Sequence, residues 1–197
     1  MPHYYTPNPS TDHNVKLIEA TLRGGLFRFY TDTGVFSKTQ VDYGSRVLIE
    51  AMRIPAGADV LDLGCGYGPL GIAAAAQNPN GQITFVDINA RALDLAAQNC
   101  VLNGVVNPTF ILSDGFASIT AGAFDVILIN PPIRAGKDVV FRLYRGAVEH
   151  LKPGGSLWVV IQKKQGAPST ERELALCFSS VHIRERDKGY YVYEAVK

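Results

Sequence analysis

The chain has 197 residues, of which 47% are hydrophobic and 19% are charged, with a formal net charge of +1. This length suits one globular domain with a sizeable core and argues against a second full domain. No run approaches the roughly 18 apolar residues of a membrane span, and the first residues lack the pattern of a signal peptide, so we expect a cytoplasmic protein with no membrane partner. Cys and His show neither disulfide nor metal-site spacing, so we expect no metal.

The first part of the chain predicts an arm, a hairpin and a helix. Residues 1–14 are rich in Pro, Ser, Thr and Asn without periodicity, which indicates an irregular arm. Two apolar and aromatic runs, 17–22 and 26–30, flank Arg23-Gly24-Gly25, a pattern typical of a β-hairpin. A helix is then indicated by apolar residues at helical spacing: Val47, Leu48, Ala51 and Met52. We therefore interpret residues 1–54 as an extension packed on a core domain at 55–197.

A glycine-rich turn organises that core domain. The apolar strand 59–63 leads into four glycines and an Ala-rich helical segment at 72–76. Glycine permits positive φ and close approach of a ligand, and the N–H groups at the start of the following helix point toward that ligand. The run Gly66-Tyr67-Gly68-Pro69-Leu70-Gly71 fits the G-x-G-x-x-G pattern of dinucleotide sites, although about 55 preceding residues leave little room for a dehydrogenase substrate domain. A tight turn without a ligand is the simplest alternative.

The same loop also resembles a second kind of cofactor site. The run Asp62-Leu63-Gly64-Cys65-Gly66-Tyr67-Gly68 is similar to the D/E-x-G-x-G-x-G signature of class I methyltransferases, which bind S-adenosylmethionine. The acidic residue stands two positions before the first glycine, as in that family. The resemblance therefore implies a set of cofactor-binding candidates in this loop: Asp62, Gly64, Cys65, Gly66 and Gly68.

Carboxylates follow the next two strands. Asp87 ends a buried strand at 82–87, where it can accept hydrogen bonds from two ribose hydroxyls, with Ile88 beside it. Asp87 as a helix-capping or turn residue is the alternative. The helix that follows begins at Asn89 and ends at Asn103-Gly104.

A third strand, 109–112, ends at Ser113-Asp114-Gly115. In class I methyltransferases an acidic residue at this point accepts a hydrogen bond from the adenine amino group, which makes Asp114 and Gly115 further cofactor-binding candidates. Asp114 as the cap of a short turn stays open.

The fourth strand, 124–129, ends at the candidate catalytic residues Asn130, Pro131 and Pro132. Two prolines stiffen the backbone and remove two N–H donors, which leaves carbonyl oxygens beside the Asn amide. An exocyclic amine presented there can donate one hydrogen to the Asn130 side-chain oxygen and one to the Pro131 carbonyl, and its nitrogen then faces a methyl donor. A proline-closed strand end without a ligand is the alternative.

The remaining pattern completes an alternating α/β chain. We expect, in order, a helix at 139–151 ended by Lys152-Pro153-Gly154-Gly155, a strand at 157–161, a polar loop at 162–166, a helix at 171–178, and strands at 181–184 and 190–196.

These motifs occur in the order and spacing of class I methyltransferases. More narrowly, three runs resemble short single-domain members of the bacterial small-subunit (16S) rRNA guanine-N2 methyltransferase family: Gly34-Val35-Phe36-Ser37, Asp42-Tyr43-Gly44-Ser45 and Asn130-Pro131-Pro132-Ile133-Arg134-Ala135-Gly136-Lys137. The resemblance implies a doubly wound, mostly parallel seven-stranded sheet of the Rossmann-like type, with an antiparallel C-terminal strand and a small N-terminal hairpin and helix.

The resemblance further implies transfer of a methyl group from S-adenosylmethionine to guanine N2 of small-subunit ribosomal RNA, free or in an assembly intermediate. Related amine-methylating enzymes often have Tyr or Phe after Asn-Pro-Pro, where it stacks on the base, whereas this chain has Ile133. We therefore expect Phe36 to supply the stacking. The full-length family has a second domain that helps to bind RNA, and this chain leaves that role to its arm and its C-terminal third.

Charge is unevenly distributed along the chain. The net charge is +1 over residues 1–55, −5 over 56–132 and +5 over 133–197. An acidic core suits a sulfonium cofactor and a basic flank suits a phosphate-bearing substrate, although such differences also arise by chance. Four basic residues follow adjacent strands and are expected to border the methyl-transfer pocket: Arg134, Lys137, Lys163 and Lys164.

Three alternatives to an RNA methyltransferase remain. A protein methyltransferase acting on a glutamine amide also uses Asn-Pro-Pro, but usually with Tyr next. A small-molecule amine is a further acceptor. A non-enzymatic adenosine-ligand binding module explains the Asp62 loop but not Asn130. The sequence does not indicate the oligomeric state.

Overall fold

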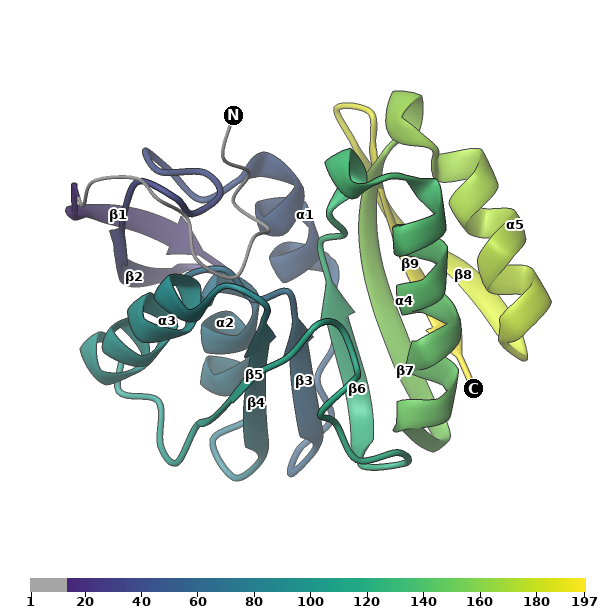
Figure 1. Ribbon diagram of the computed structural model, residues 1–197, viewed down its shortest axis with the longest axis horizontal. Helices are drawn as coiled ribbons and strands as arrows, with labels where there is room; N and C mark the ends of the chain where they lie inside the picture. Colours follow the sequence, from purple (N-terminus) through teal and green to yellow (C-terminus); the bar gives the residue numbers. More distant parts are fainter. Residues whose placement is uncertain (1–13) are drawn as a thin grey trace.

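The protein is described from a computed structural model in which residues 14–197 are placed (Figure 1). The irregular arm expected at 1–14 therefore lies, except for Asn14, outside the described residues.

A seven-stranded sheet forms the centre of the fold, with the strand order β5-β4-β3-β6-β7-β9-β8. Its strands are β3 (Asp59–Leu63), β4 (Gln82–Asp87), β5 (Thr109–Leu112), β6 (Phe124–Ile129), β7 (Leu151–Gln162), β8 (Ser180–Asp187) and β9 (Tyr190–Val196). Strands β5, β4, β3, β6 and β7 pair in parallel, and β9 is antiparallel to both of its neighbours. The order reverses between β3 and β6, which makes this the topological switch point of the sheet. The predicted doubly wound fold is confirmed.

Helices cover both faces of this sheet. They are α1 (Tyr43–Ala51), α2 (Pro69–Gln77), α3 (Ala90–Leu102), α4 (Lys137–His150) and α5 (Ala167–Cys177), with short 3₁₀ turns η1 (Ile133–Ala135) and η2 (Lys163–Gln165). One apolar core joins α1, α2 and α3 to alternate strand residues such as Val60 and Leu128. The other joins α4 and α5, which lie side by side in Figure 1, to the opposite face through residues such as Leu61 and Ile127.

A separate two-stranded hairpin, β1 (Lys16–Leu22) and β2 (Gly25–Thr31), packs on the helices. Asn99 and Asn103, four residues apart on α3, hold the outer edge of β2. The Tyr30 N–H donates to the Asn99 side-chain oxygen at 2.6 Å, and the Asn99 amide nitrogen donates back to the Tyr30 carbonyl at 3.0 Å. Arg28 and Asn103 form the same pair of hydrogen bonds, at 3.1 and 2.7 Å. Two side-chain amides thus take the place of a neighbouring strand.

The turn of the hairpin is tied to the end of α1. The Arg23 guanidinium donates to the carbonyls of Ile49, Glu50 and Met52 at 2.8–3.2 Å. These are carbonyls that the end of a helix leaves unpaired, so the hairpin caps α1. The predicted hairpin at Arg23-Gly24-Gly25 is confirmed.

Three boundaries differ from the expectation. Residues 152–155 belong to β7, because Phe124 pairs with Leu151 and Val126 with Ser156, so the intervening residues form a bulge. The expected polar loop at 162–166 contains the turn η2. Helix α5 begins at Ala167, before the expected 171, because Pro168 fixes a helical φ in its first turn.

Candidate active site

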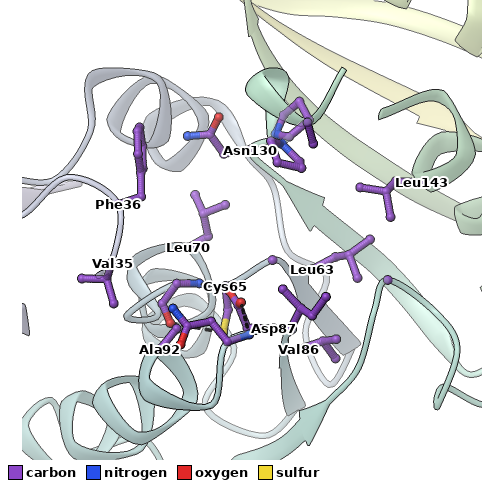
Figure 2. Close-up of a pocket in the computed structure, with 18 of the residues that line it drawn as sticks. Val35, Phe36, Leu63, Cys65, Leu70, Val86, Asp87, Ala92, Asn130 and Leu143 are labelled. Carbon is purple, nitrogen blue, oxygen red and sulfur yellow. Dashed lines mark hydrogen bonds between the residues drawn. The ribbon is translucent and has the colours of Figure 1, made fainter. Parts of the chain in front are cut away.

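A cavity of about 460 Å³ opens beyond the carboxyl ends of β3, β4, β5 and β6 (Figure 2). It lies where the strand order reverses, the usual place of a ligand site in a doubly wound sheet. Its lining includes polar residues (Asp42, Ser45, Asp87, Asn89, Ser113, Asp114, Asn130, Arg134, Arg142), glycines of two loops (Gly64, Gly66, Gly115) and apolar residues (Val35, Phe36, Leu63, Cys65, Tyr67, Leu70, Val86, Ile88, Pro131, Pro132, Leu143).

The glycine-rich loop forms the floor of the cavity. Gly64, Gly66 and Gly68 all have positive φ, at 71°, 56° and 92°. A side chain at Gly64 or Gly66 would meet no protein atom within 4 Å, so both positions face open space. The N–H groups of Gly64 and Cys65 donate to the Val86 carbonyl at 2.8 and 2.9 Å. The loop is thereby fixed to the end of β4, and Gly64 and Gly66 leave room for a ligand against the main chain. Gly68 does not line the cavity, because it packs against Ala96 and Phe85.

Asp62 lies beneath this loop and does not line the cavity. Its carboxylate is fully buried; Oδ2 accepts the Gly71 N–H at 2.8 Å, and Oδ1 has no hydrogen-bond partner in the described chain. Burial raises the pKa of Asp62 to about 7, with a smaller contribution from the charge of Asp87. The carboxylate holds the first turn of α2 through the Gly71 N–H. Asp62 therefore affects a ligand only indirectly, by fixing the glycine-rich loop.

Asp87 and Ile88 line the cavity at the end of β4. The Asp87 carboxylate accepts the Gly66 N–H at 2.8 Å and the Asn89 N–H at 2.9 Å. Burial raises its pKa, although these backbone hydrogen bonds oppose the shift. The predicted α3 cap is Asn89, whose side chain accepts the Arg91 N–H. Asp87 is held by two backbone donors and keeps lone pairs for a ligand.

The loop after β5 forms one wall. Asp114 is exposed and forms an ion pair with Arg142 at 3.6 Å. The turn there is capped by Ser113, whose hydroxyl accepts the Ser118 N–H at 3.0 Å. Gly115, with φ of 58°, lets the wall pass close to Leu143. Asp114 is thus free of the capping role that the sequence left open.

Asn130 is oriented by two residues of the N-terminal extension. Its amide nitrogen donates to Asp42 Oδ2 and to Ser45 Oγ, each at 3.0 Å. A carboxylate only accepts, so the amide nitrogen must be the atom that faces Asp42. The Asn130 side-chain oxygen accepts no hydrogen bond from the described residues, and Asn130 lines the cavity. Both amide hydrogens are thus occupied while the acceptor stays available.

Asp42 and Ser45 are site residues whose role sequence reasoning missed. Asp42 also caps α1, because the same Oδ2 accepts the Ser45 N–H at 3.0 Å. The run Asp42-Tyr43-Gly44-Ser45 carries a recognisable helix-start signal, but nothing local connects it with a strand end 88 residues away.

The residues around Asn130 complete one end of the cavity. Figure 2 shows Phe36 and Asn130 near each other at one end and Asp87 toward the other. Phe36 is 43% exposed and Pro131 and Pro132 line the cavity beside it. The Pro131 carbonyl accepts the Ile133 N–H at 2.9 Å and keeps one lone pair. Ile133 packs half-buried against the α4 core and does not line the cavity.

Of the four basic residues expected to border the pocket, only one lines the cavity. Arg134 lines the cavity, whereas Lys137, Lys163 and Lys164 do not. Lys137 lies over the Phe141 ring at 4.9 Å, and the other two are exposed on η2. Figure 1 shows that the chain leaves β6 and β7 at one edge of the sheet. A shared edge brings loops together but does not fix the direction of their side chains. Arg134 therefore lines the cavity although the three lysines do not.

Within residues 14–197, no helix is both long and apolar enough to cross a membrane, and no cluster of His, Cys, Asp or Glu side chains is suited to hold a metal ion.

Comparison with known proteins identifies the family. Residues 26–194 match the methyltransferase small domain family. The chain belongs to this family. It is 44% identical to protein YbxB of Bacillus subtilis (strain 168), over 99% of this chain and 98% of that protein. It is 36% identical to the ribosomal RNA small subunit methyltransferase C of Mannheimia succiniciproducens, over 78% of this chain but only 46% of that relative.

A solved structure agrees with this family. The T. thermophilus 16S rRNA N2 G1207 methyltransferase (RsmC), in complex with AdoMet and guanosine, superposes with a TM-score of 0.83 at 27% identity, over 96% of this chain and 52% of that one. The chain therefore matches about half of these longer methyltransferases. The resemblance to the small-subunit rRNA methyltransferase family is confirmed.

Proposed function

We propose that this methyltransferase transfers a methyl group from S-adenosylmethionine to an exocyclic amine, and that the amine is guanine N2 of small-subunit ribosomal RNA. The observation that carries the reaction type is the fixed amide of Asn130, whose oxygen is left as an acceptor at the cavity wall. A binding module for an adenosine ligand has no use for such an oriented acceptor beside two prolines.

The cavity fits S-adenosylmethionine. Gly64 and Gly66 leave open space against the main chain, and Asp87 offers carboxylate lone pairs for ribose hydroxyls at the end of β4. Ile88, Asp114 and Gly115 line the region where an adenine ring would follow. Asp42 and Asp87 form no ion pair in the described part of the chain, so their negative charge is available to a cationic ligand.

S-adenosylmethionine, when bound, supplies an electrophilic methyl group on a sulfonium centre. In this proposal Asn130 Oδ1 and the Pro131 carbonyl accept the two hydrogens of the acceptor amine. These bonds favour a pyramidal nitrogen and stabilise the transition state more than the ground state, in which the lone pair is delocalised into the ring. In this proposal Phe36, an exposed aromatic residue of the cavity lining, stacks on the base. No strong base is required, because the methylated ammonium is acidic and loses its proton to water.

The choice of ribosomal RNA is supported by the relatives. The Mannheimia protein is named as a methyltransferase of small-subunit ribosomal RNA, and the T. thermophilus protein was solved with guanosine. This chain matches about half of the length of each of these two relatives. We infer that Arg134 in the cavity lining and the exposed Lys163 and Lys164 on η2 contribute to RNA binding.

The test is methyl transfer with labelled S-adenosylmethionine. The protein is incubated with naked ribosomal RNA, small subunits, partly assembled small subunits and a protein fraction, and the labelled nucleoside is identified and mapped. N2-methylguanine in small-subunit RNA is expected. Label in protein, in a small molecule or in another nucleoside would contradict the substrate.

Asn130→Ala tests the mechanism in the same assay. It is expected to bind S-adenosylhomocysteine normally and to lose about a hundredfold or more in turnover, as when one oriented polar contact is lost. The matched control is Asn80→Ala, an exposed asparagine in the turn before β4, which should retain full turnover. Near-normal turnover of Asn130→Ala would refute the catalytic role.

A further inference from the structure

Tyr67 is a buried tyrosine in the glycine-rich loop whose hydroxyl the proposed mechanism does not use. It stands between Gly66 and Gly68 and is only 3% exposed. Its ring meets Phe29 of the hairpin edge to face, at 5.7 Å between centroids, and its carbonyl accepts the Asn99 amide at 2.9 Å. Ring and backbone are therefore held in place from outside the cavity.

The hydroxyl of Tyr67 has no hydrogen-bond partner among the described residues, although it is fully buried and the residue lines the cavity. Buried hydroxyls in folded proteins are nearly always paired, because losing water without gaining a partner is costly. An unpaired one in a binding cavity indicates a partner on the ligand.

This hydroxyl acts as a donor. Burial raises the pKa of Tyr67, and the nearby negative charge of Asp42 raises it further. Tyr67 is therefore protonated throughout the physiological pH range and can give its hydrogen to an oxygen of the ligand.

The loop has few other donors to offer to an anionic group. The N–H groups of Gly64 and Cys65 bond to Val86, and that of Gly68 bonds to the Cys65 carbonyl. The N–H groups of Gly66 and Gly71 bond to carboxylates, those of Asp87 and Asp62. These five backbone donors are already occupied within the protein. The Tyr67 hydroxyl is therefore one of the few donors that this loop offers to a ligand carboxylate, beside the N–H groups of Tyr67 and Leu70.

We propose that the Tyr67 hydroxyl donates to the α-carboxylate of the methionine part of S-adenosylmethionine. The inference rests on the proposed function. With the ribose assigned to Asp87 and the acceptor amine to Asn130, the α-carboxylate is the remaining anionic group of S-adenosylmethionine, and it requires a hydrogen-bond donor. Tyr67 is a cofactor-binding residue in this assignment and takes no part in methyl transfer itself.

The test compares Tyr67→Phe with the wild-type protein by calorimetry, using two ligands. S-adenosylhomocysteine carries the carboxylate, and 5′-methylthioadenosine lacks the amino-acid part. Tyr67→Phe is expected to bind S-adenosylhomocysteine roughly ten- to a hundredfold more weakly, the range for a hydrogen bond to a charged group. Its affinity for 5′-methylthioadenosine should not change.

Thermal unfolding without ligand gives an independent measurement. Tyr67→Phe removes an unpaired buried hydroxyl, so the unfolding midpoint should stay the same or rise. The matched control is Tyr193→Phe, because Tyr193 is also buried but its single hydroxyl hydrogen has two acceptors in reach, the Ala167 carbonyl at 3.3 Å and the Glu171 carboxylate at 3.2 Å. The control should lower the midpoint and bind both ligands normally.

Three results would overturn the assignment. Unchanged affinity of Tyr67→Phe for S-adenosylhomocysteine would remove the contact, and equal weakening toward both ligands would place it on the adenosine part. A lowered midpoint in Tyr67→Phe would show that the hydroxyl is paired within the protein. If the wild-type protein binds neither ligand, the proposed function fails, and this inference fails with it.

Discussion

Replacing Asp62 by asparagine should change how the stability of the protein depends on pH. The pKa of Asp62 is raised from an ordinary value of 3.8 to about 7 in the folded protein, mainly by burial. Ionisation of this carboxyl therefore opposes folding. The penalty is absent below pH 3.8, grows as the pH rises from 3.8 to 7, and is constant above 7. A shift of about three units at 1.36 kcal/mol per unit gives a full penalty on the order of 4 kcal/mol.

The part of this penalty that an experiment can isolate lies between pH 5 and pH 7. Over that interval the free energy of unfolding of the wild type should fall relative to that of Asp62→Asn by about 2 kcal/mol, because asparagine does not titrate. Any pH-independent effect of the asparagine amide on the free energy of unfolding cancels, because only the change between pH 5 and pH 7 is compared. Urea denaturation at half-unit pH steps measures the difference.

Asp94→Asn is the control for the loss of one charge, because Asp94 is exposed on α3. Its free energy of unfolding should run nearly parallel to that of the wild type over the same range. A wild-type curve that also stays parallel to Asp62→Asn from pH 5 to 8 would show that Asp62 is ionised throughout, and the argument from burial would be wrong.

Three further predictions concern the loop, the cofactor and the RNA. Gly71→Ala places a Cβ 2.3 Å from the Phe85 ring and should lower the free energy of unfolding by about 1–3 kcal/mol in urea titrations; a wild-type midpoint would mean that the ring moves aside freely. Asp87→Ala should weaken binding of S-adenosylhomocysteine by about 1.5–3 kcal/mol in calorimetry, and an unchanged affinity would reduce Asp87 to a turn residue. Replacing both Lys163 and Lys164 by Ala should flatten the slope of log RNA affinity against log salt by about 1.4–1.8 units while cofactor affinity is kept, and an unmoved slope would exclude both lysines from the RNA interface.

The sheet was predictable because its parallel strands are buried on both faces. Such strands appear as short apolar runs, as at Val60-Leu61 and Ile127-Leu128, and polar or glycine-rich turns separate them. The predicted strand boundaries were wrong where the local turn composition of the sequence competed with hydrogen bonding between strands. Lys152-Pro153-Gly154-Gly155 has the composition of a turn, yet the strand continues through it as a bulge.

The site was predictable as far as its residues stand at strand ends. Asp87, Asp114 and Asn130 line one cavity because the carboxyl ends of parallel strands share one edge. The partners of Asn130 were not, because Asp42 and Ser45 approach it only through packing of α1 on the sheet. Hydrogen bonds between residues so far apart leave no local pattern.

The asparagine contacts on the hairpin also protect the outer edge of β2 from pairing with another strand. An outer strand with unpaired N–H and C=O groups is a template on which a second chain can add a strand, the first step of many aggregation reactions. In β2 the main-chain groups of Arg28 and Tyr30 are already saturated by Asn103 and Asn99. A helix thus blocks strand addition at Arg28 and Tyr30 without extending the sheet.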